Sequence, residues 1–481
     1  MGQLLTLVTD FYEYSMAYTY FKEGRHNEVA YFDVFTRKIP DGGGFYVFNG
    51  LHKFIDYVQN FKFTPEQITY LHDTGEFDEE FLDYLSTLKL NIDMWSVPEG
   101  TPVFANEPVI TVRGTFVEAQ IIESFLLQCV NYSSLTTTKA SRIVRAAKGR
   151  GVLEFGTRRA HGYDASIEGA RAAVVAGCKG TACTEAGYKY DVPVSGTMAH
   201  SFIQVYNNEY DAFLAYARNN PDNCVFLVDT YDTLRSGVPN SIKVAQDFLI
   251  PNGYRLKGIR LDSGDLAYLS KMAREMLDEA GLKDTAIIVS NSLDEFIIDD
   301  LLLQDAKIDI FGVGENLITS KSSPVLGGVY KVVAFERDGT LVPTIKVSDN
   351  IEKITNPGYK KLYRFYDNDS NIALADLITL ANETINPDEY EIFDPVAPWK
   401  RKRLTNYTVK ELQVPIFEKG KLIYHVPSTS DVAQYHRNQM QTLWDEVKRL
   451  RNPHNYYVDL SQNLWDLKNK MLEEKTSKEK L

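Results

Sequence analysis

Three features of the sequence predict an α/β fold that contains a parallel barrel. Between Val152 and Leu317, a short apolar strand followed by a polar signature and a helix-like stretch recurs at least six times. Strands that alternate with helices at a spacing of roughly thirty residues indicate parallel βαβ units. No low-complexity linker separates this repeat from the mixed α/β segments around it. We therefore expect interwoven domains rather than domains joined in series.

Each repeat ends its strand in a polar signature. The six signatures are Glu154–Arg159, Ser195–Ser201, Asp229–Asp232, Arg260–Asp265, Ser290–Glu295 and Gly312–Asn316. Parallel α/β barrels carry their chemistry at the carboxyl ends of the strands. The sequence therefore has the layout of an enzyme with a polar site at one mouth of the barrel.

The segments before the repeat alternate between helix and strand patterns. An N-terminal helix with Asp10 as its cap precedes strand-like alternation over residues 29–35. Thr64-Pro-Glu-Gln67 is a typical helix start within a mostly helical stretch, residues 52–90. Strand patterns punctuated by proline and glycine follow over residues 91–115.

A second helical pattern leads into the repeat over residues 117–150. Its second half, Lys139–Arg150, is basic on one side. We expect that side to be a solvated helix face rather than a phosphate contact. After the repeat, hairpin-like strands are predicted over residues 334–367, and residues 395–481 are aromatic and highly charged.

The charge balance argues against two classes of partner. The chain of 481 residues has 52 Lys and Arg against 65 Asp and Glu, a formal net charge of −13. A protein that binds nucleic acid or a membrane surface needs a basic footprint, so neither partner is expected. Anionic substrates must then be held by local clusters of cations.

The cysteines and the N-terminus predict a cytoplasmic protein. The four cysteines, at positions 129, 178, 183 and 224, form no CxxC pair and no zinc-type spacing with histidines. Reduced structural thiols are therefore expected. The first ten residues lack the basic start and long apolar core of a signal peptide, and no run of about eighteen apolar residues occurs.

His200 is the first candidate for a catalytic residue. It lies in Gly196–Ser201, directly after the apolar Val192–Val194. An isolated histidine is more often a packed or capping residue, but here neighbouring hydroxyl side chains can orient the ring. Imidazole is one of the few side chains that act as nucleophile or proton carrier near neutral pH. We therefore predict that His200 is catalytic.

Two pairs of acids follow neighbouring strands of the repeat. Asp232 and Asp265 suit the first turns of the helices that follow, and we expect them to be helix caps. Asp229 and Asp262 are the first acids beyond their strands. We predict that these two orient His200 or bind ribose hydroxyls.

Arginines at the strand ends are the candidate anion ligands. Arg158, Arg159 and Arg260 can each offer a fork of donors to a carboxylate or phosphate. A salt bridge across the barrel rim is the alternative for Arg260.

Two glycine pairs can expose backbone N–H groups to a phosphate. They are Gly312 with Gly314 and Gly327 with Gly328. Neither pair fits GxxxxGK[ST] or GxGxxG. Together they favour a phosphorylated sugar over a dinucleotide.

Six strings in chain order closely resemble the nicotinate phosphoribosyltransferase family. They are Thr9–Tyr12, Glu154–Ala160, Gly196–Phe202, Val228–Asp232, Ile259–Asp265 and Leu326–Lys331. The resemblance runs from about residue 5 to about residue 425, and the joint occurrence of these strings is highly specific. It implies an irregular parallel α/β barrel with an interwoven α/β sandwich domain, and a homodimer with active sites shared at the interface.

The expected domains follow from this resemblance. Residues 1–130 with about 335–425 would form the sandwich, residues 131–334 the barrel, and residues 426–481 a C-terminal helical extension. The implied reaction joins nicotinate to phosphoribosyl pyrophosphate, giving nicotinate mononucleotide and pyrophosphate, coupled to ATP hydrolysis with Mg²⁺. Displacing pyrophosphate from ribose C1 develops oxocarbenium character, so positioning and charge control matter more than a strong base.

The resemblance also implies roles for individual residues. His200 matches the histidine that ATP phosphorylates. Tyr12 and Phe155 match an aromatic pair that sandwiches the pyridine ring, with Tyr12 reaching in from the partner subunit. Thr197 and Arg260 match residues that contact nicotinate.

Ribose and phosphate contacts are implied for a further set of residues. Asp229 would lie near His200, and Asp262 would hold ribose. The implied phosphate or pyrophosphate contacts are Gly327 and Gly328 in one turn, with Arg37, Arg158 and Lys346 as weaker candidates. No residue is assigned as a Mg²⁺ ligand.

Glu315 is a departure from the family pattern. Many members carry a threonine that touches phosphoribosyl pyrophosphate at the position of Glu315. A carboxylate there would repel phosphate unless Mg²⁺ or a lysine intervened.

Three alternatives stay open from the sequence. The sister enzyme that uses nicotinamide has an acid in the loop corresponding to Lys179–Thr184, where this chain has none, which favours nicotinate. A sugar-phosphate aldolase or isomerase of the Schiff-base type is disfavoured, because no lysine lies in the six signatures. A binding or regulatory protein without catalysis would make His200 dispensable.

Overall fold

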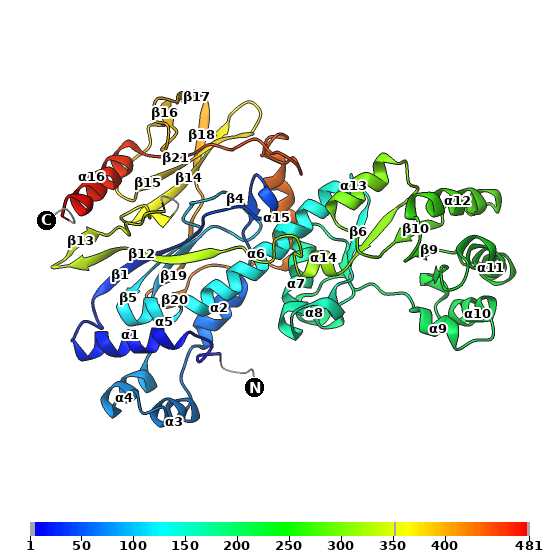
Figure 1. The fold of residues 1–481 in the computed structure, drawn as a ribbon, viewed down its shortest axis with the longest axis horizontal. Coiled ribbons are helices and arrows are strands. Elements are labelled where there is room, and N and C mark those ends of the chain that lie inside the picture. The colour runs from blue at the N-terminus through cyan, green and yellow to red at the C-terminus, as the bar shows by residue number, and fades with distance from the viewer. Residues whose placement is uncertain (1–4, 351–352, 479–481) are drawn as a thin grey trace. The chain divides into compact units, whose positions relative to one another are not determined.

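The computed structural model describes residues 5–350 and 353–478 as a mixed α/β protein, which confirms the predicted fold class (Figure 1). The chain divides into two compact units. One unit comprises residues 1–135, 325–427 and 435–481, and the other comprises residues 136–324 and 428–434. We call the first the sandwich unit and the second the barrel unit.

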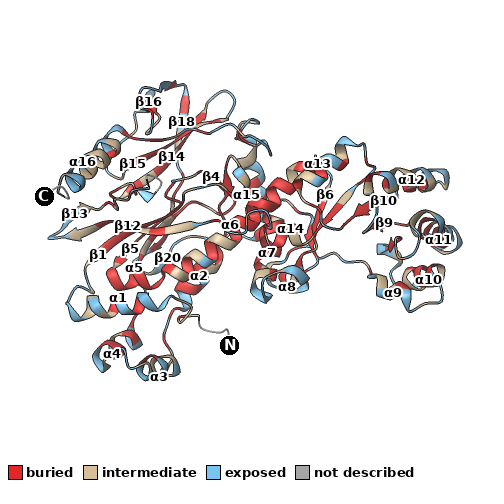
Figure 2. Cartoon of the chain, in the orientation of Figure 1, coloured by how far each residue is buried: buried red, intermediate tan, exposed pale blue. Residues whose placement is uncertain are grey.

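The barrel unit is built on one parallel sheet that forms part of a barrel. Its six strands lie in the order β7-β6-β11-β10-β9-β8, and every pair is parallel. The strands are β6 (Gly151–Glu154), β7 (Gly180–Thr181), β8 (Val225–Leu227), β9 (Gly258–Leu261), β10 (Ala286–Val289) and β11 (Ile310–Val313). Figure 2 shows these strands mainly buried, as expected for a parallel sheet covered by helices.

Helices connect these strands, as the repeat predicts. They are α7 (Tyr163–Val175), α8 (Thr184–Tyr190), α9 (His200–Gln204), α10 (Glu209–Asn219), α11 (Val238–Val244), α12 (Leu266–Glu279), α13 (Glu295–Leu303) and α14 (Glu315–Ile318). The predicted caps are confirmed, since the carboxylate of Asp232 accepts the N–H groups of Leu234 and Arg235. Asp265 likewise accepts the N–H group of Tyr268 at the start of α12.

The prediction of a solvated basic face over Lys139–Arg150 is wrong for its first half. The side chains of Lys139 and Arg142 are each only 2% exposed and both contact the buried carboxylate of Glu295. Lys139 Nζ lies 2.8 Å from Glu295 Oε2, and Arg142 Nε lies 2.8 Å from Oε1. These cations therefore join α6 (Glu123–Ala146) to the start of α13 inside the barrel unit.

The sandwich unit contains two larger sheets and two small ones. The seven-stranded sheet has the order β13-β12-β1-β5-β3-β19-β20, and the four-stranded sheet has the order β18-β14-β15-β21. Strands of the first are β1 (Val29–Thr36), β3 (Asp93–Ser96), β5 (Ile110–Thr115), β12 (Gly328–Arg337), β13 (Thr340–Pro343), β19 (Val414–Glu418) and β20 (Lys421–Leu422). Strands of the second are β14 (Lys360–Asp367), β15 (Ala373–Leu380), β18 (Tyr407–Glu411) and β21 (Val458–Leu460).

The remaining strands form short pairs, and helices flank the sheets. The pairs are β2 (Tyr46–Val47) with β4 (Pro102–Val103), and β16 (Glu389–Phe393) with β17 (Arg401–Thr405). The helices are α1 (Phe11–Lys22), α2 (Leu51–Asn60), α3 (Pro65–Asp73), α4 (Glu79–Thr87), α5 (Phe116–Ile121), α15 (Thr429–Gln441) and α16 (Gln462–Lys478). Apolar side chains from β1, β5, α2, α4 and α5 make the main core of this unit.

Helix starts in the sandwich unit follow the sequence signals in one case and depart from them in another. The hydroxyl of Thr64 accepts the N–H of Gln67, and the Gln67 side chain accepts the N–H of Thr64, a reciprocal capping box. Asp10 does occupy the N-cap position of α1, but its side chain makes no capping hydrogen bond. Instead, α1 is fastened by the buried Glu13, which accepts hydrogen bonds from Ser124 N and Oγ.

All four cysteines are free and buried, which confirms the prediction of reduced structural thiols. Within residues 5–350 and 353–478, no helix combines the length and the apolar character needed to cross a membrane.

Candidate functional site

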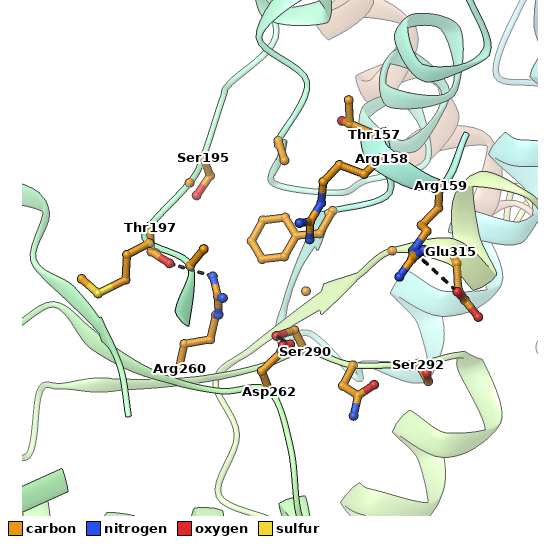
Figure 3. A pocket seen from close by; sticks show the side chains of 18 residues that line it. Thr157, Arg158, Arg159, Ser195, Thr197, Arg260, Asp262, Ser290, Ser292 and Glu315 are labelled. Carbon is orange, nitrogen blue, oxygen red and sulfur yellow. Dashed lines mark hydrogen bonds and ion pairs between the residues drawn. The ribbon is translucent and has the colours of Figure 1, made fainter. Parts of the chain in front are cut away.

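A pocket of about 560 Å³ lies at the carboxyl ends of the parallel strands of the barrel unit (Figure 3). Five of the six predicted signatures contribute to its lining: those that follow β6, β9, β10 and β11, and the one that begins at Ser195. Its lining residues are Phe155, Thr157, Arg158, Arg159, Ala182, Ser195, Gly196, Thr197, Met198, Ala199, Arg260, Asp262, Ser290, Asn291, Ser292, Gly312, Gly314 and Glu315. The pocket thus brings together most of the residues that the strand-end pattern predicts.

Phe155 forms an aromatic wall of the pocket because β11 has glycine beside it. A Cβ at Gly312 would lie 2.5 Å from Phe155 Cδ2, so any side chain there would displace the ring. The turn that carries Phe155 is held by the fully buried Glu154, which accepts hydrogen bonds from Gly156 N and from Thr181 Oγ1. Burial raises the pKa of the Glu154 carboxyl. Gly312 therefore leaves space for the Phe155 ring, whereas the sequence suggested that Gly312 contacts a phosphate.

Arg260 presents its guanidinium to the pocket from the end of β9. Its Nη1 donates to Thr197 Oγ1 at 2.7 Å (Figure 3). Its Nε is buried and has no hydrogen-bond partner among the described residues. Burial lowers the pKa of this guanidinium, and the carboxylates of Asp262 and Asp229 oppose that shift. A buried N–H without a partner beside an open pocket is the signature of a group that meets a ligand.

His200 begins α9, and the structure places it beside both predicted acids. Its Nδ1 lies 3.1 Å from Thr230 Oγ1. Its Nε2 lies 3.8 Å from Asp262 Oδ2 and 4.0 Å from Asp229 Oδ1. The imidazole side chain is 39% exposed, so a ligand can reach it while its orientation is constrained.

The two acids are themselves held by hydrogen bonds. The side chain of Asp229 is 1% exposed, and its Oδ2 accepts from Asp262 N at 2.9 Å and Ser263 Oγ at 2.6 Å. Its Oδ1 has no hydrogen-bond partner among the described residues and is the oxygen nearest His200 Nε2. Asp262 accepts a short hydrogen bond from Ser290 Oγ, which leaves its Oδ2 on the side of the imidazole.

The predicted cations differ in what they contact. In Figure 3 Arg158 extends toward the middle of the lining side chains, whereas Arg159 turns toward Glu315. Glu315 carries its own counterions: Lys321 Nζ at 2.8 Å and Arg159 Nε at 3.9 Å. The contact with Lys321 lowers the pKa of Glu315. Lys321 thus compensates the negative charge of Glu315, which would otherwise repel a phosphate.

The other predicted site residues belong to the sandwich unit. Tyr12 lies on α1 with 46% of its surface exposed, and partial burial, followed by the charge of Glu123, raises the pKa of its phenol. Arg37 follows β1, where its guanidinium lies over the Phe35 ring at 5.8 Å and its buried Nε has no hydrogen-bond partner in the part of the chain that the structure describes. Lys346 is exposed after β13.

The two glycines of the Gly327–Gly328 turn have different surroundings. Gly327 is exposed with a φ of 71°, a conformation that favours glycine. The N–H of Gly328 instead donates to Asn131 Oδ1 at 3.0 Å. A Cβ at Gly328 would lie 2.3 Å from that oxygen, so this glycine permits a close approach of Asn131.

The predicted strings contain three residues that the sequence did not single out as candidates. Thr230 contacts the His200 ring, Ser290 holds Asp262, and Glu154 holds the Phe155 turn. All three lie in strand-end signatures, and this position is the sequence feature that could have identified them. Their roles depend on partners from other strands, so the signatures alone could not rank them.

Side chains that could form a metal centre by themselves are absent from the described ranges. No group of three or more His, Cys, Asp or Glu side chains converges in residues 5–350 and 353–478. Asp229 and Asp262 can therefore supply only part of a coordination shell.

Models of one protein family match successive parts of the chain. Three family models match: the nicotinate phosphoribosyltransferase N-terminal domain at residues 7–131, the nicotinate phosphoribosyltransferase family at residues 151–377, and its C-terminal domain at residues 359–468.

Individual relatives match over nearly full length. A nicotinate phosphoribosyltransferase of Bacillus subtilis is 48% identical over 477 residues, 98% of this chain and 96% of the relative. One of Dictyostelium discoideum is 35% identical, covering 97% of this chain and 88% of the relative. The crystal structure of the human nicotinic acid phosphoribosyltransferase superposes with a TM-score of 0.86 at 28% identity, over 97% of this chain and 100% of that one.

Proposed function

Because the chain belongs to the nicotinate phosphoribosyltransferase family and is an enzyme of that type, we propose that it couples phosphoribosyl transfer to ATP hydrolysis through a phosphate carried by His200. Nicotinate and phosphoribosyl pyrophosphate are the substrates, and nicotinate mononucleotide and pyrophosphate are the products. The observation that carries the site assignment is the buried, unpartnered Nε of Arg260 beside the aromatic ring of Phe155.

Nicotinate is a flat ring with one carboxylate, and the pocket offers a partner for each part. The ring would stack on Phe155, and the carboxylate would accept from Arg260 and Thr197. Residues 179–184 contribute only Ala182 to the lining. An acid at that place would accept from an amide and repel a carboxylate, so its absence supports nicotinate over nicotinamide.

The ribose and its pyrophosphate would occupy the polar side of the same pocket. The nicotinate ring nitrogen attacks ribose C1, the bond from C1 to the pyrophosphate oxygen breaks, and its electron pair leaves with pyrophosphate. We infer that Asp262, which lines the pocket, binds ribose hydroxyls and stabilises the positive charge that develops on the ribose ring. We infer that Arg158, whose side chain points toward the middle of the pocket lining, contacts the phosphates. When bound with these phosphates, Mg²⁺ would neutralise part of their charge.

His200 can act as a phosphoryl acceptor because its two nitrogens face different groups. The buried, unpartnered Asp229 Oδ1 favours the proton on Nε2, which leaves the lone pair on Nδ1 beside Thr230. In the proposed step, Nδ1 attacks the γ-phosphorus of ATP, and the bond to the bridging oxygen breaks with its electron pair leaving on ADP. Water later attacks the phosphorus, the N–P bond breaks, and inorganic phosphate is released.

A phosphorylation experiment tests the coupling. We expect ATP labelled at the γ-phosphate to transfer label to the protein, in an acid-labile and alkali-stable form, at His200. His200→Ala should carry no label and lose the ATP-stimulated part of the rate. An unchanged ATP-coupled rate in His200→Ala would refute the proposed phosphohistidine.

Substrate choice is tested separately. Purified protein with phosphoribosyl pyrophosphate, ATP and Mg²⁺ should convert nicotinate and leave nicotinamide nearly untouched. Turnover of nicotinamide at an equal or greater rate would overturn the assignment of nicotinate.

We further propose a homodimer in which Tyr12 of one subunit completes the partner's site. The partly exposed aromatic ring of Tyr12 supports this proposal. Tyr12→Ala and His200→Ala homodimers would each lack the ATP-stimulated rate, but each mixed dimer would contain one intact site. Random reassociation should therefore recover about one quarter of the wild-type ATP-stimulated rate. No recovery of this rate from mixtures in which subunits have demonstrably exchanged would rule out shared sites.

A further inference from the structure

The sandwich unit contains a second cavity that the proposed reaction does not use. Its volume is about 340 Å³, within the range of small-molecule sites. It is lined from the seven-stranded sheet by β1 and β12, from the four-stranded sheet by β14, β15 and β21, and by α16 and the loop before residue 397. Residues separated by more than four hundred positions in the sequence, such as Asp33 and Lys468, thus line the same cavity.

Most of the cavity wall is apolar. Phe35, Val333, Ile354, Ile378 and Leu460 all line it. Two of these side chains, Val333 and Ile378, are each 1% exposed and belong to the cores on which the sheets pack. Val396, in contrast, is 86% exposed, so the wall at that residue is open to solvent. A ligand could therefore enter there and place an apolar body against the sheets.

One of the two lysines in the cavity is fully compensated. Lys360 Nζ lies 2.9 Å from Asp33 Oδ2, and both side chains are 2% exposed. The same ammonium donates to the carbonyl oxygens of Asn356 and Gly358. The other carboxylate oxygen of Asp33 accepts from Thr111 Oγ1 at 2.8 Å. This ion pair is electrically balanced and has no donor left for a ligand.

Lys468 is not compensated. From α16 it reaches the cavity, where its ammonium donates to the neutral side-chain oxygen of Asn356 at 2.8 Å. No carboxylate of the described residues forms an ion pair with it. Asp394, the other acid in the lining, instead accepts hydrogen bonds from the N–H groups of Val396 and Ala397, and its Oδ2 lies 3.8 Å from Lys400 Nζ. Burial and the neighbouring charge of Lys360 lower the pKa of Lys468. A partly desolvated ammonium in an apolar cavity is costly unless an anion meets it.

We propose that this cavity is a binding site for a small monocarboxylic acid with an apolar body, whose carboxylate pairs with Lys468. The carboxylate supplies the charge that the cavity lacks, and the body replaces water against Phe35, Ile378 and Leu460. A divalent or strongly polar anion fits less well, because Lys468 is the single uncompensated cation of the lining among the described residues. The site is separate from the pocket of the barrel unit in every lining residue.

Benzoate and benzamide are suitable probes, because they share an apolar ring and differ in charge. Benzoate also resembles nicotinate, so binding is measured by calorimetry in the Arg260→Ala variant, which weakens the barrel pocket for carboxylates. We expect one benzoate per chain in this background and at least about tenfold weaker binding of benzamide. Adding Lys468→Met should weaken benzoate at least about tenfold, whereas adding Lys470→Met, two residues further along α16 and exposed, should not.

Three results would overturn the proposal: no benzoate binding in Arg260→Ala, equal binding in Arg260→Ala with Lys468→Met, or equal binding of benzamide. Lys468→Met preserves side-chain length and removes a desolvated charge, so its thermal unfolding should not be impaired. If that variant nevertheless misfolds, Ile378→Phe fills the cavity without touching its charges and should also abolish benzoate binding. Retained binding in a folded Ile378→Phe protein would likewise contradict the proposal.

Discussion

At the scale of single residues, the barrel pocket is defined by polar atoms that lack a partner. Arg260 Nε and Asp229 Oδ1 are buried and have no hydrogen-bond partner within residues 5–350 and 353–478, although most buried polar groups in proteins are hydrogen-bonded. One atom is a donor that suits a carboxylate, and the other is an acceptor that suits an imidazole N–H. These two atoms therefore indicate which groups the site can bind, which the list of lining residues alone does not.

Arg260→Lys should impair nicotinate binding more than turnover. Lysine keeps the charge but loses the fork that reaches both Thr197 and a substrate carboxylate. We expect KM for nicotinate to rise about ten- to hundredfold, with a smaller change in kcat. Steady-state kinetics check this, with exposed Arg255→Lys as the control. A normal KM for nicotinate would show that Arg260 does not contact the carboxylate.

Ser290→Ala should lower kcat by releasing Asp262. The hydroxyl of Ser290 fixes one oxygen of Asp262 and so turns the other toward His200. Loss of this single hydrogen bond should reduce kcat about fivefold to tenfold and leave KM for nicotinate nearly unchanged. Ser292→Ala, in the same pocket lining, is the matched control. Equal effects of the two substitutions would argue against a positioning role for Ser290.

The sequence was sufficient for residues whose role depends on neighbours along the chain. Asp232 and Asp265 cap the turns that directly follow them, so their role could be predicted from position. The pairing of Lys139 with Glu295 spans 156 residues and could not be predicted from a basic helical pattern. The partners of His200 needed the sheet as well, since Thr230 and Asp262 come from two other strand ends.

At the scale of elements, a glycine in a short strand of the parallel sheet leaves room for an aromatic side chain of the pocket. Gly312 lies on β11 beside the Phe155 ring, and β11 lies between β6 and β10 in the sheet. The repeat predicted parallel strands and their carboxyl-terminal signatures. It did not predict that β11, the last strand, pairs with β6, the first, because strand order depends on packing between distant segments.

Gly312→Ala should displace the aromatic wall. The new Cβ would lie 2.5 Å from the Phe155 ring, closer than van der Waals contact allows. We expect a rise of about tenfold or more in KM for nicotinate, with far-ultraviolet circular dichroism unchanged. Gly196→Ala is the control, because its Cβ meets no atom within 4 Å. Unchanged kinetics in a folded Gly312→Ala protein would mean that the ring does not hold the substrate.

At the scale of the whole molecule, a fully buried acidic pair makes stability depend on pH. Glu107 lies beside Asp376, which accepts two hydrogen bonds from the buried Arg364. Burial, and then the charge of Asp376, raise the pKa of Glu107 well above its ordinary value. The folded state therefore holds a proton on Glu107 that the unfolded chain releases at lower pH.

The sign of the effect follows from this raised pKa. The protonated Glu107 carboxyl contributes its full stabilisation below the pKa that Glu107 has in the unfolded chain. This stabilisation is lost as pH rises toward the pKa of Glu107 in the folded protein, by up to about 1.4 kcal/mol per pH unit. Glu107→Gln keeps a donor for Asp376 and an acceptor for the N–H of Phe104 without a titrating proton. The Tm of this variant should match that of the wild type near about pH 4 and exceed it increasingly toward pH 8. A parallel Tm profile, as expected for exposed Glu76→Gln, would contradict this assignment.

The burial of every native thiol makes this chain a convenient host for site-directed labels. Cys129, Cys178, Cys183 and Cys224 are shielded, and burial also raises the pKa of the Cys178 and Cys224 thiols, which disfavours their reactive thiolates. A cysteine introduced at an exposed position would therefore react first with a maleimide or a nitroxide reagent. Tyr12→Cys, on the surface of α1, would carry a spin label whose pairwise distance reports directly on how two copies associate in solution.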